Sequence, residues 1–239
     1  CRALNLDFPK VHLDPDKAAA LAAYPFENLG FDSAMPYFSV VLEAAALGET
    51  IDWGSGLDMP AQKYDKDHHV HDFVMPEDFL DRAPVKALLG AIELLRKRYG
   101  NELFILGKAM GPWTLGLHLC GTENFLVDTI LDKQKVHYLL DKYQHVTKVF
   151  AQAQLEAGAD MITMADHITG DLASKETYAE FLQPIHKNLL RQFDKNTIVL
   201  HCCGKTLDRI PLFTEAGFDL YHFESKNEVE KYIRQHIEK

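Results

Sequence analysis

"LEAGADMITM", residues 155–164, and "TEAGFDLYHF", residues 214–223, share one order of residue types. In each, a helical pattern ends at a glycine, an aspartate follows two residues later, and a short run of β-forming residues comes next. Repetition of such a unit is typical of βα architecture, in which the strands are parallel. The pattern therefore predicts an α/β fold with a mainly parallel sheet.

The rest of the chain alternates between apolar runs and amphipathic segments in the same way. The apolar runs predict strands and the segments with three-to-four spacing predict helices. No Rossmann-type glycine fingerprint follows any strand, so we expect a TIM-type (β/α)8 barrel. The predicted strands are 103–110, 159–166, 196–203 and 218–225, and the predicted helices are 84–99, 136–157, 175–193 and 226–238.

The domain organisation follows from these signals. We expect a single barrel domain over 1–239, with 1–80 as an irregular N-terminal part: 33–48 holds a short strand and a helix, and 54–80 is loop. A closed barrel of this type typically takes about 250 residues. Because few strands are visible and the chain opens on Cys1, we expect an incomplete barrel that lacks an N-terminal piece and the last one or two βα units.

Composition excludes several classes of protein. The net charge is −10 and no Lys/Arg cluster occurs, which argues against nucleic acid and against an anionic membrane surface as partners. No apolar run approaches the roughly 18 residues of a membrane span, and no signal peptide is visible. Two of the four cysteines are adjacent, so a disulfide framework is not expected and a reducing cytoplasm is the predicted location.

Chemistry is expected where the predicted strands end, because parallel sheets and barrels build their sites at the carboxyl ends of the strands. Each of the four strand ends carries polar or ligand-competent groups. After the first strand come Gly111, Pro112 and Trp113, then Asp166 and His167 after the second, His201, Cys202 and Cys203 after the third, and Glu224 and Ser225 after the fourth.

His201 and Cys203 are the strongest candidates. They are two residues apart, so in extended geometry they project to one side while Cys202 projects to the other. A thiolate with an imidazole is a typical zinc pair, and Gly204 allows a sharp turn. The alternative is that both cysteines are packing residues and His201 is a hydrogen-bonded core histidine. Because no second cysteine pair exists, a zinc site here would be catalytic, with three protein ligands and an open position.

Other candidates are weaker on residue type or spacing. "HHVH", 68–71, lies among aspartates in a polar loop and is expected to be solvated. His118 and Cys120 fall in a predicted helix about 200° apart, so they are poor co-ligands. Glu43 is expected as an exposed or cap-region helix residue, with a barrel-facing role as the alternative. Asp166, an acid at the end of a central strand beside His167, is expected to be functional.

Several stretches together resemble the uroporphyrinogen decarboxylase superfamily, and within it the corrinoid-dependent methyltransferase branch of the methylcobamide:coenzyme M methyltransferase type. The H-x-C-G motif at His201–Gly204 is the most specific piece, since the decarboxylases do not use it for chemistry. The resemblance covers nearly the whole sequence. It rests on "FPKVHLDPDKAAALA" (8–22), "MPYFSVVLEAAALG" (35–48), "GPWTLGLHLCGTENF" (111–125), "AGADMITMADHITGDLASKETYAEFLQPIHKNL" (157–189) and "VLHCCGKTLDRIPLFTEAGFDLYHFESK" (199–226).

The resemblance implies a (β/α)8 barrel whose funnel holds Zn²⁺ through His201, Cys203 and a second, distant cysteine. No cysteine follows Cys203 in this sequence, so the third ligand is expected in the missing C-terminal strands, with Glu224 or solvent as the alternative that completes the site. The implied reaction moves a methyl group from a methylated corrinoid, carried by a corrinoid protein, to a small-molecule acceptor. That acceptor is a thiol such as coenzyme M or tetrahydrofolate.

Roles for the remaining strand-end residues follow from the same resemblance. Asp166 is expected to orient the acceptor or to support His201 from the second shell. The cofactor-binding positions are then predicted to be Met110, Gly111, His167 and Glu224.

Two other functions are compatible with the sequence. One is a porphyrinogen decarboxylase, although "CRALNL" at the start provides no Arg-rich substrate loop. The other is a non-catalytic accessory chain that binds a corrinoid protein. "ADHITG", which contains His167, is only superficially similar to the corrinoid-carrying D-x-H-x-x-G motif, so the chain is expected to be a partner rather than a carrier.

Overall fold

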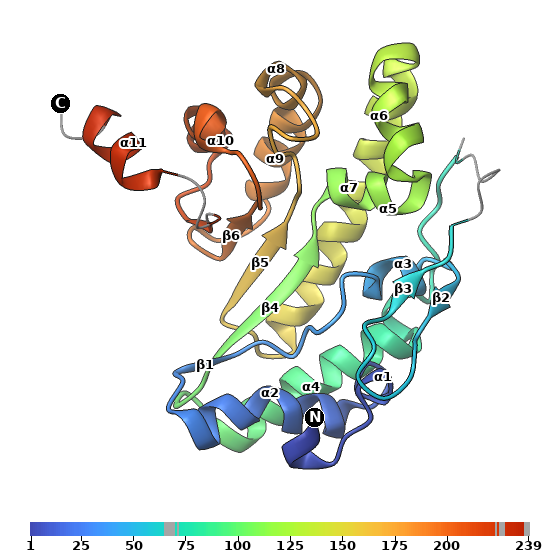
Figure 1. The fold of residues 1–239 in the computed structure, drawn as a ribbon, viewed down its shortest axis with the longest axis vertical. Helices are drawn as coiled ribbons and strands as arrows, with labels where there is room; N and C mark the ends of the chain where they lie inside the picture. The colour runs from blue at the N-terminus through green and yellow to red at the C-terminus, as the bar shows by residue number, and fades with distance from the viewer. Residues whose placement is uncertain (65–69, 71, 223, 225–227, 237–239) are drawn as a thin grey trace.

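The computed structural model describes residues 1–64, 70, 72–222, 224 and 228–236. Its centre is a five-stranded parallel sheet in the order β1-β4-β5-β6-β7, with helices packed along it (Figure 1). The strands are β1 (Ser33–Ala34), β4 (Phe104–Met110), β5 (Met161–Ala165), β6 (Ile198–His201) and β7 (Tyr221–His222). The predicted α/β fold with a parallel sheet is confirmed. Within the described residues β1 and β7 are the edges of the sheet, so closure into a barrel stays a prediction.

The repeated helix–glycine–strand unit is present in both places. Gly158 and Gly217 have φ of 113° and 111°, a region that favours glycine, and each ends the helix before a strand. Asp160 in the first unit then accepts a hydrogen bond of 2.7 Å from the Ile105 N–H. The turn therefore ties the start of β5 to the neighbouring strand β4.

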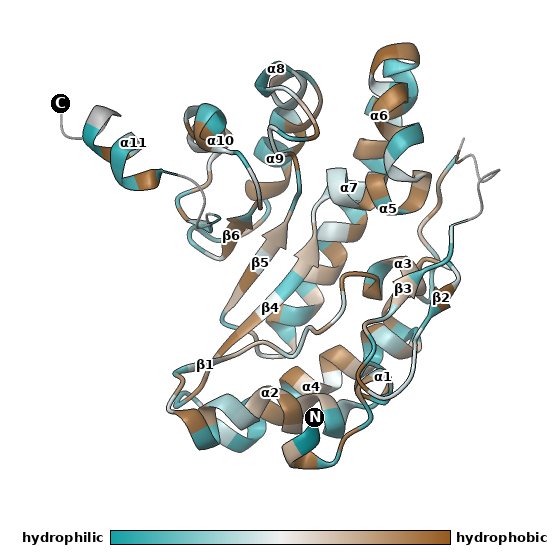
Figure 2. Cartoon of the chain, viewed as in Figure 1, coloured by the Kyte–Doolittle hydropathy of each residue, from teal (hydrophilic) through white to brown (hydrophobic). Residues whose placement is uncertain are grey.

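The helices predicted from periodicity are found near their expected bounds. They are α4 (Ala83–Tyr99), α7 (Lys133–Glu156) and α11 (Val229–His236). Figure 2 shows brown and teal side by side along α2 (Pro15–Leu29) and α4, as expected of helices with one apolar face. Their buried residues join those of β4, β5 and α7 in the main hydrophobic core.

The segment 175–193, predicted as a single helix, is interrupted. It consists of α8 (Lys175–Thr177), a π-helical turn η3 (Tyr178–Leu182) and α9 (Gln183–Leu190). Pro184 lacks an N–H group and so cannot continue the regular hydrogen-bond ladder. The interruption lies where Tyr178 and Leu182 are fully buried.

The N-terminal part is more regular than expected. The loop predicted over 54–80 contains β3 (Ala61–Gln62), which pairs with β2 (Ile51–Asp52) as an antiparallel ribbon. The strand and helix expected in 33–48 are present as β1 and α3 (Leu42–Ala46). The other elements are η1 (Arg2–Leu4), α1 (Phe8–Val11), η2 (Phe79–Asp81), α5 (Pro112–Cys120), α6 (Thr122–Leu131), η4 (Leu207–Arg209) and α10 (Ile210–Ala216).

Among the described residues, no helix combines the length and the apolar character needed to cross a bilayer.

Candidate functional site at the carboxyl ends of the strands

The strand register brings the predicted site residues to one edge of the sheet. Met110 is paired with Ala165, Ala165 with His201, and His201 with His222. These pairs form a single row at the carboxyl ends of β4 to β7. Residues at the ends of successive strands, far apart in the sequence, are therefore close in space, as expected for a parallel sheet.

His201 and Cys203 converge within this row. The Sγ atom of Cys203 lies 3.2 Å from Nε2 of His201. Cys203 is exposed and His201 is half-buried, whereas Cys202 is only 3 % exposed and packs into the core. The predicted opposite orientation of the two cysteines is confirmed, and the two donors stand at the water-accessible side of the sheet edge.

The turn after Cys203 depends on a glycine. Gly204 has φ of 82°, and a Cβ atom at this position would lie 2.3 Å from Thr169 Oγ1. The Gly204 N–H donates to a carboxylate oxygen of Glu224, which places that carboxylate beside the turn. Glu224 therefore lies beside the turn, and one of its contacts is with the Gly204 backbone; its role in binding a cofactor stays a prediction.

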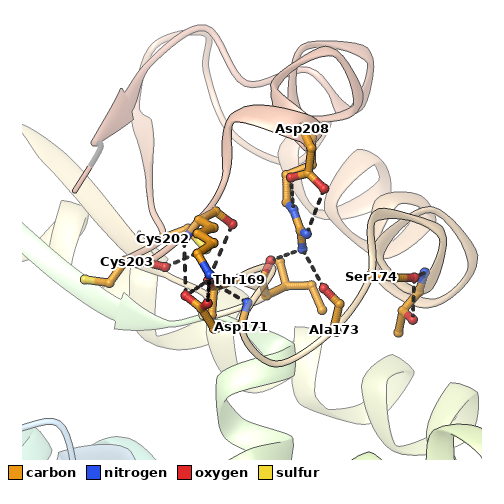
Figure 3. A network of polar contacts seen from close by, with 11 residues as sticks. Thr169, Asp171, Ala173, Ser174, Cys202, Cys203 and Asp208 are labelled. Carbon is orange, nitrogen blue, oxygen red and sulfur yellow. Dashed lines mark hydrogen bonds and ion pairs between the residues drawn. The ribbon is translucent and has the colours of Figure 1, made fainter. Parts of the chain in front are cut away.

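A polar network holds this turn against the loop that follows β5 (Figure 3). Arg209 is fully buried, and its guanidinium donates to the carbonyl oxygens of Ile168 (2.6 Å) and Ala173 (3.2 Å). Asp171 pairs with the Lys205 ammonium at 2.9 Å. In Figure 3 the Cys203 sulfur points away from this network, so the thiol is free of the contacts that fix its backbone.

Two more histidines surround His201. Nδ1 of His222 lies 2.8 Å from Nδ1 of His201, and the two ring centroids are 4.6 Å apart. The ring of His167 is 5.8 Å from that of His201, so this predicted site residue does lie at the site. His222 was not among the predicted site residues, although its place near the end of the predicted strand 218–225 was a usable signal.

The electrostatics favour an uncharged imidazole. Burial is the main cause that lowers the pKa of His201 to about 4, and the charges of His222, Lys108 and His167 contribute to this shift. His201 is therefore neutral at neutral pH, the state that can bind a metal. Burial raises the pKa of the Cys203 thiol, and the Glu224 carboxylate adds to this effect, while Lys108 opposes it.

Lys108 is a second residue that the sequence analysis missed. It lies in the middle of β4, and its Nζ is 5.1 Å from the centroid of the Tyr37 ring. Burial is the main cause that lowers its pKa. A lysine in an otherwise apolar strand was the available signal. Its charge acts on both His201 and Cys203, so it favours a thiolate at the site.

Glu43 lies in the first turn of α3, within the predicted cap region, but the expectation that it is exposed was wrong. Glu43 is only 1 % exposed, and its carboxylate accepts hydrogen bonds from the Tyr37 hydroxyl and from the Met110 N–H (2.8 Å). Burial raises its pKa to about 7. The residue lies on α3, and the end of β4 packs over it. The sequence of a helix alone does not show which distant element packs against it.

Glu43 should make stability depend on pH. Since its folded pKa exceeds the usual 4.5, the native state holds the proton more tightly than the unfolded chain, and stability falls as pH rises from 4.5 to 7. The loss from this group amounts to about 3 kcal/mol. Glu43→Gln can still accept from the Met110 N–H through Oε1 and can donate to the Tyr37 hydroxyl through Nε2, and it should abolish this decline in urea unfolding measured across that range. The exposed Glu93→Gln is the control; a decline that persists in Glu43→Gln would contradict the assignment.

Asp166 is fully buried, and its carboxylate faces α5. It accepts hydrogen bonds from the Thr114 N–H (2.8 Å) and the Trp113 N–H (3.4 Å), and it pairs with His186 Nε2 at 2.9 Å. The link to His201 is a backbone one, from the Asp166 N–H to the His201 carbonyl at 3.0 Å. The carboxylate thus binds the N-terminus of a helix and a buried histidine instead of the His201 ring.

Met110 and Gly111 lie at the carboxyl end of β4, beside the site. The Met110 side chain is 1 % exposed, and its carbonyl accepts a hydrogen bond from the Thr147 hydroxyl at 2.8 Å. A Cβ atom on Gly111 would lie 2.2 Å from the Asp166 carboxyl carbon. Close packing explains both residues, and their predicted role in binding a cofactor stays a prediction.

Two of the weaker candidates lie near this site: Glu43 accepts from the Met110 N–H, and burial together with the charge of His167 lowers the pKa of His118. Cys120 contacts the Tyr143 hydroxyl at 3.5 Å, which is consistent with its rejection as a partner of His118. His68, His69 and His71 of "HHVH" lie outside the described residues. Across the part of the chain that the structure describes, no group of three or more His, Cys, Asp or Glu is arranged to hold a metal. His201 and Cys203 therefore form a pair of donors.

Comparison with known proteins decides the family. The family profile described as Uroporphyrinogen decarboxylase (URO-D) matches residues 1–239. The chain belongs to this family. The resemblance found in the sequence is thereby confirmed.

The similar curated proteins include methyltransferases and decarboxylases. The methylated-thiol--coenzyme M methyltransferase of Methanosarcina mazei is 32 % identical, over 92 % of this chain and 60 % of its own length. A methylcobamide:CoM methyltransferase of Methanosarcina barkeri is also 32 % identical, over 92 % and 65 %. A uroporphyrinogen decarboxylase of Magnetococcus marinus is 25 % identical, over 81 % and 55 %. The chain thus spans under two thirds of the length of these relatives.

One solved structure has the same fold. A methyltransferase from Methanosarcina mazei superposes with a TM-score of 0.88 at 24 % identity, covering 98 % of this chain and 70 % of that one. The agreement confirms the fold over almost the whole chain.

Proposed function

We propose that this protein is a zinc-dependent methyltransferase of the barrel type, which moves a methyl group from a methylated corrinoid to a thiol or to tetrahydrofolate. The observation that carries the proposal is the 3.2 Å approach of Cys203 Sγ to His201 Nε2 at the carboxyl ends of the strands. The methyltransferase relatives support it, since they are 32 % identical while the decarboxylase is 25 % identical.

The donor set suits zinc. A thiolate sulfur and a neutral imidazole nitrogen are the ligand types that zinc prefers, and the pair supplies two of the three protein ligands usual in catalytic sites. Glu224 lies beside the same turn, although its carboxylate contacts the Gly204 N–H. When bound, zinc would lower the pKa of an acceptor thiol so that the thiol reacts as a thiolate.

The chain's own residues would then prepare the acceptor. His201 and Cys203 would hold the zinc at the sheet edge, and the Lys108 charge, which lowers the pKa of the Cys203 thiol, would also favour an anionic acceptor beside it. When the acceptor is a thiol, its sulfur would form the new S–CH₃ bond as the Co–C bond of the donor breaks, and the electron pair of that bond would leave with the corrinoid. The methylated corrinoid arrives on a partner corrinoid protein over this edge, beside His167. Asp166 positions α5, and a reducing cytoplasm would keep Cys203 as a free thiol.

The proposal is tested with methylcobalamin as donor. The purified, zinc-loaded protein should demethylate it in the presence of a thiol such as coenzyme M or in the presence of tetrahydrofolate, and the loss of the methyl–cobalt absorbance measures the rate. Chelation of zinc should stop the reaction and zinc should restore it. Zinc-free protein that decarboxylates a porphyrinogen would point to the decarboxylase instead. Binding of a methylated corrinoid protein without turnover of any acceptor would point to an accessory chain.

A further inference from the structure

His222 stands in direct contact with His201, on the side of the ring away from Cys203. Nε2 of His201 faces Cys203 Sγ at 3.2 Å, and Nδ1 of His201 faces Nδ1 of His222 at 2.8 Å. Both ring nitrogens of His201 are therefore engaged. The contact is built into the fold, because β6 and β7 are paired in register at these two residues.

This contact matters because of how histidines bind metals. A metal-bound imidazole commonly donates its other ring N–H to an acceptor, which fixes the tautomer and the ring orientation. Asp166 was the expected acceptor, but its carboxylate is occupied by Thr114 and His186. His222 lies at hydrogen-bond distance from the nitrogen that needs one.

We propose that His222 is a positioning residue, which accepts a hydrogen bond from Nδ1–H of His201 and so holds His201 Nε2 ready for zinc. The inference rests on the proposed function. Only one proton fits between two Nδ1 atoms at this distance. When Nε2 of His201 binds the metal, the proton between the rings is on Nδ1 of His201. His222 then carries its own proton on Nε2.

The geometry separates this role from that of a ligand. Nδ1 and Nε2 lie on different sides of an imidazole ring, so a metal shared by His201 Nε2 and Cys203 lies away from the His222 contact. His222 thus contacts the metal ligand His201 and does not itself bind the metal. Loss of the His222 hydrogen bond should therefore lower the affinity for zinc.

The test compares two variants of nearly equal size in the full chain. His222→Asn places an amide oxygen where Nδ1 was and can accept the hydrogen bond, whereas His222→Leu cannot. Zinc affinity is measured by competition with a chromophoric chelator. We expect His222→Leu to bind zinc about 10- to 100-fold more weakly than wild type, the usual cost of losing such a partner, and His222→Asn to recover most of this loss.

The exposed His145→Leu on α7 controls for loss of a surface imidazole and should bind zinc as wild type does. A ¹H–¹⁵N spectrum of the zinc-loaded protein should show the His201 proton on Nδ1. Equal affinities for wild type and His222→Leu would overturn the positioning role. So would complete loss of zinc in both His222 variants, since that would make His222 a ligand. Wild type that binds no zinc at all would instead refute the proposed function, and this inference with it.

Discussion

Cys203→Ala and His201→Ala should each reduce zinc from near-stoichiometric to background content and abolish methyl transfer, whereas Cys202→Ala should retain both. The physical reason is the geometry of consecutive residues at a strand end. Cys203 and His201 converge at 3.2 Å on the accessible side, while Cys202 is buried in the core. Loss of either donor removes one of the few protein ligands a catalytic zinc site has.

The comparison of Cys202→Ala with Cys203→Ala makes this experiment discriminating, because both variants make the same chemical change, the loss of one thiol, at adjacent positions. Metal content after dialysis is measured by atomic emission, and methyl transfer by the methylcobalamin assay. Circular dichroism establishes that each variant is folded. Equal zinc content in wild type and all three variants would refute the assignment of the ligands.

Asp166→Ala should lower the free energy of unfolding by about 3–5 kcal/mol, because each buried donor left without its acceptor costs about 1–3 kcal/mol. The variant removes the partner of His186 and leaves two N–H groups of α5 without their acceptor. Urea unfolding followed by circular dichroism measures the loss. Asp219→Ala, which breaks an exposed pair with Lys195 at 3.8 Å, should cost under about 1 kcal/mol.

The same variant separates two roles for Asp166. A loss of stability below about 1 kcal/mol would contradict a structural role for Asp166 in linking α5 to His186. If Asp166→Ala proves as stable as wild type and retains zinc but fails in methyl transfer, Asp166 would act on the acceptor, as its strand-end position predicts. Asp166→Asn can still accept from the helix N-terminus and should lose less stability than Asp166→Ala.

Much of the fold could be predicted because its signals are local. A helix ending at Gly158 or Gly217 and a strand directly after it depend on the conformations of neighbouring residues, and both units are present. The opposite orientation of Cys202 and Cys203 follows from the two-residue period of extended chain, and it too is confirmed. The family was also visible, since H-x-C-G and its flanking stretches are contiguous.

What the local pattern could not provide is which distant groups meet. Glu43 was placed at the surface because a helix does not reveal what packs on it; the end of β4 covers it. Asp166 was expected either to orient the acceptor or to support the His201 ring, and its carboxylate binds α5 and His186.

The residues of this sequence alone therefore determine the α/β elements, the two donors at the end of one strand and the side on which they stand. The pairing of His201 with His222, the approach of Lys108 and the covering of Glu43 depend on tertiary structure. The reason is physical: these contacts join residues 20 or more positions apart, and their proximity is set by strand register and helix packing across the sheet. Such contacts form only when the whole chain is folded.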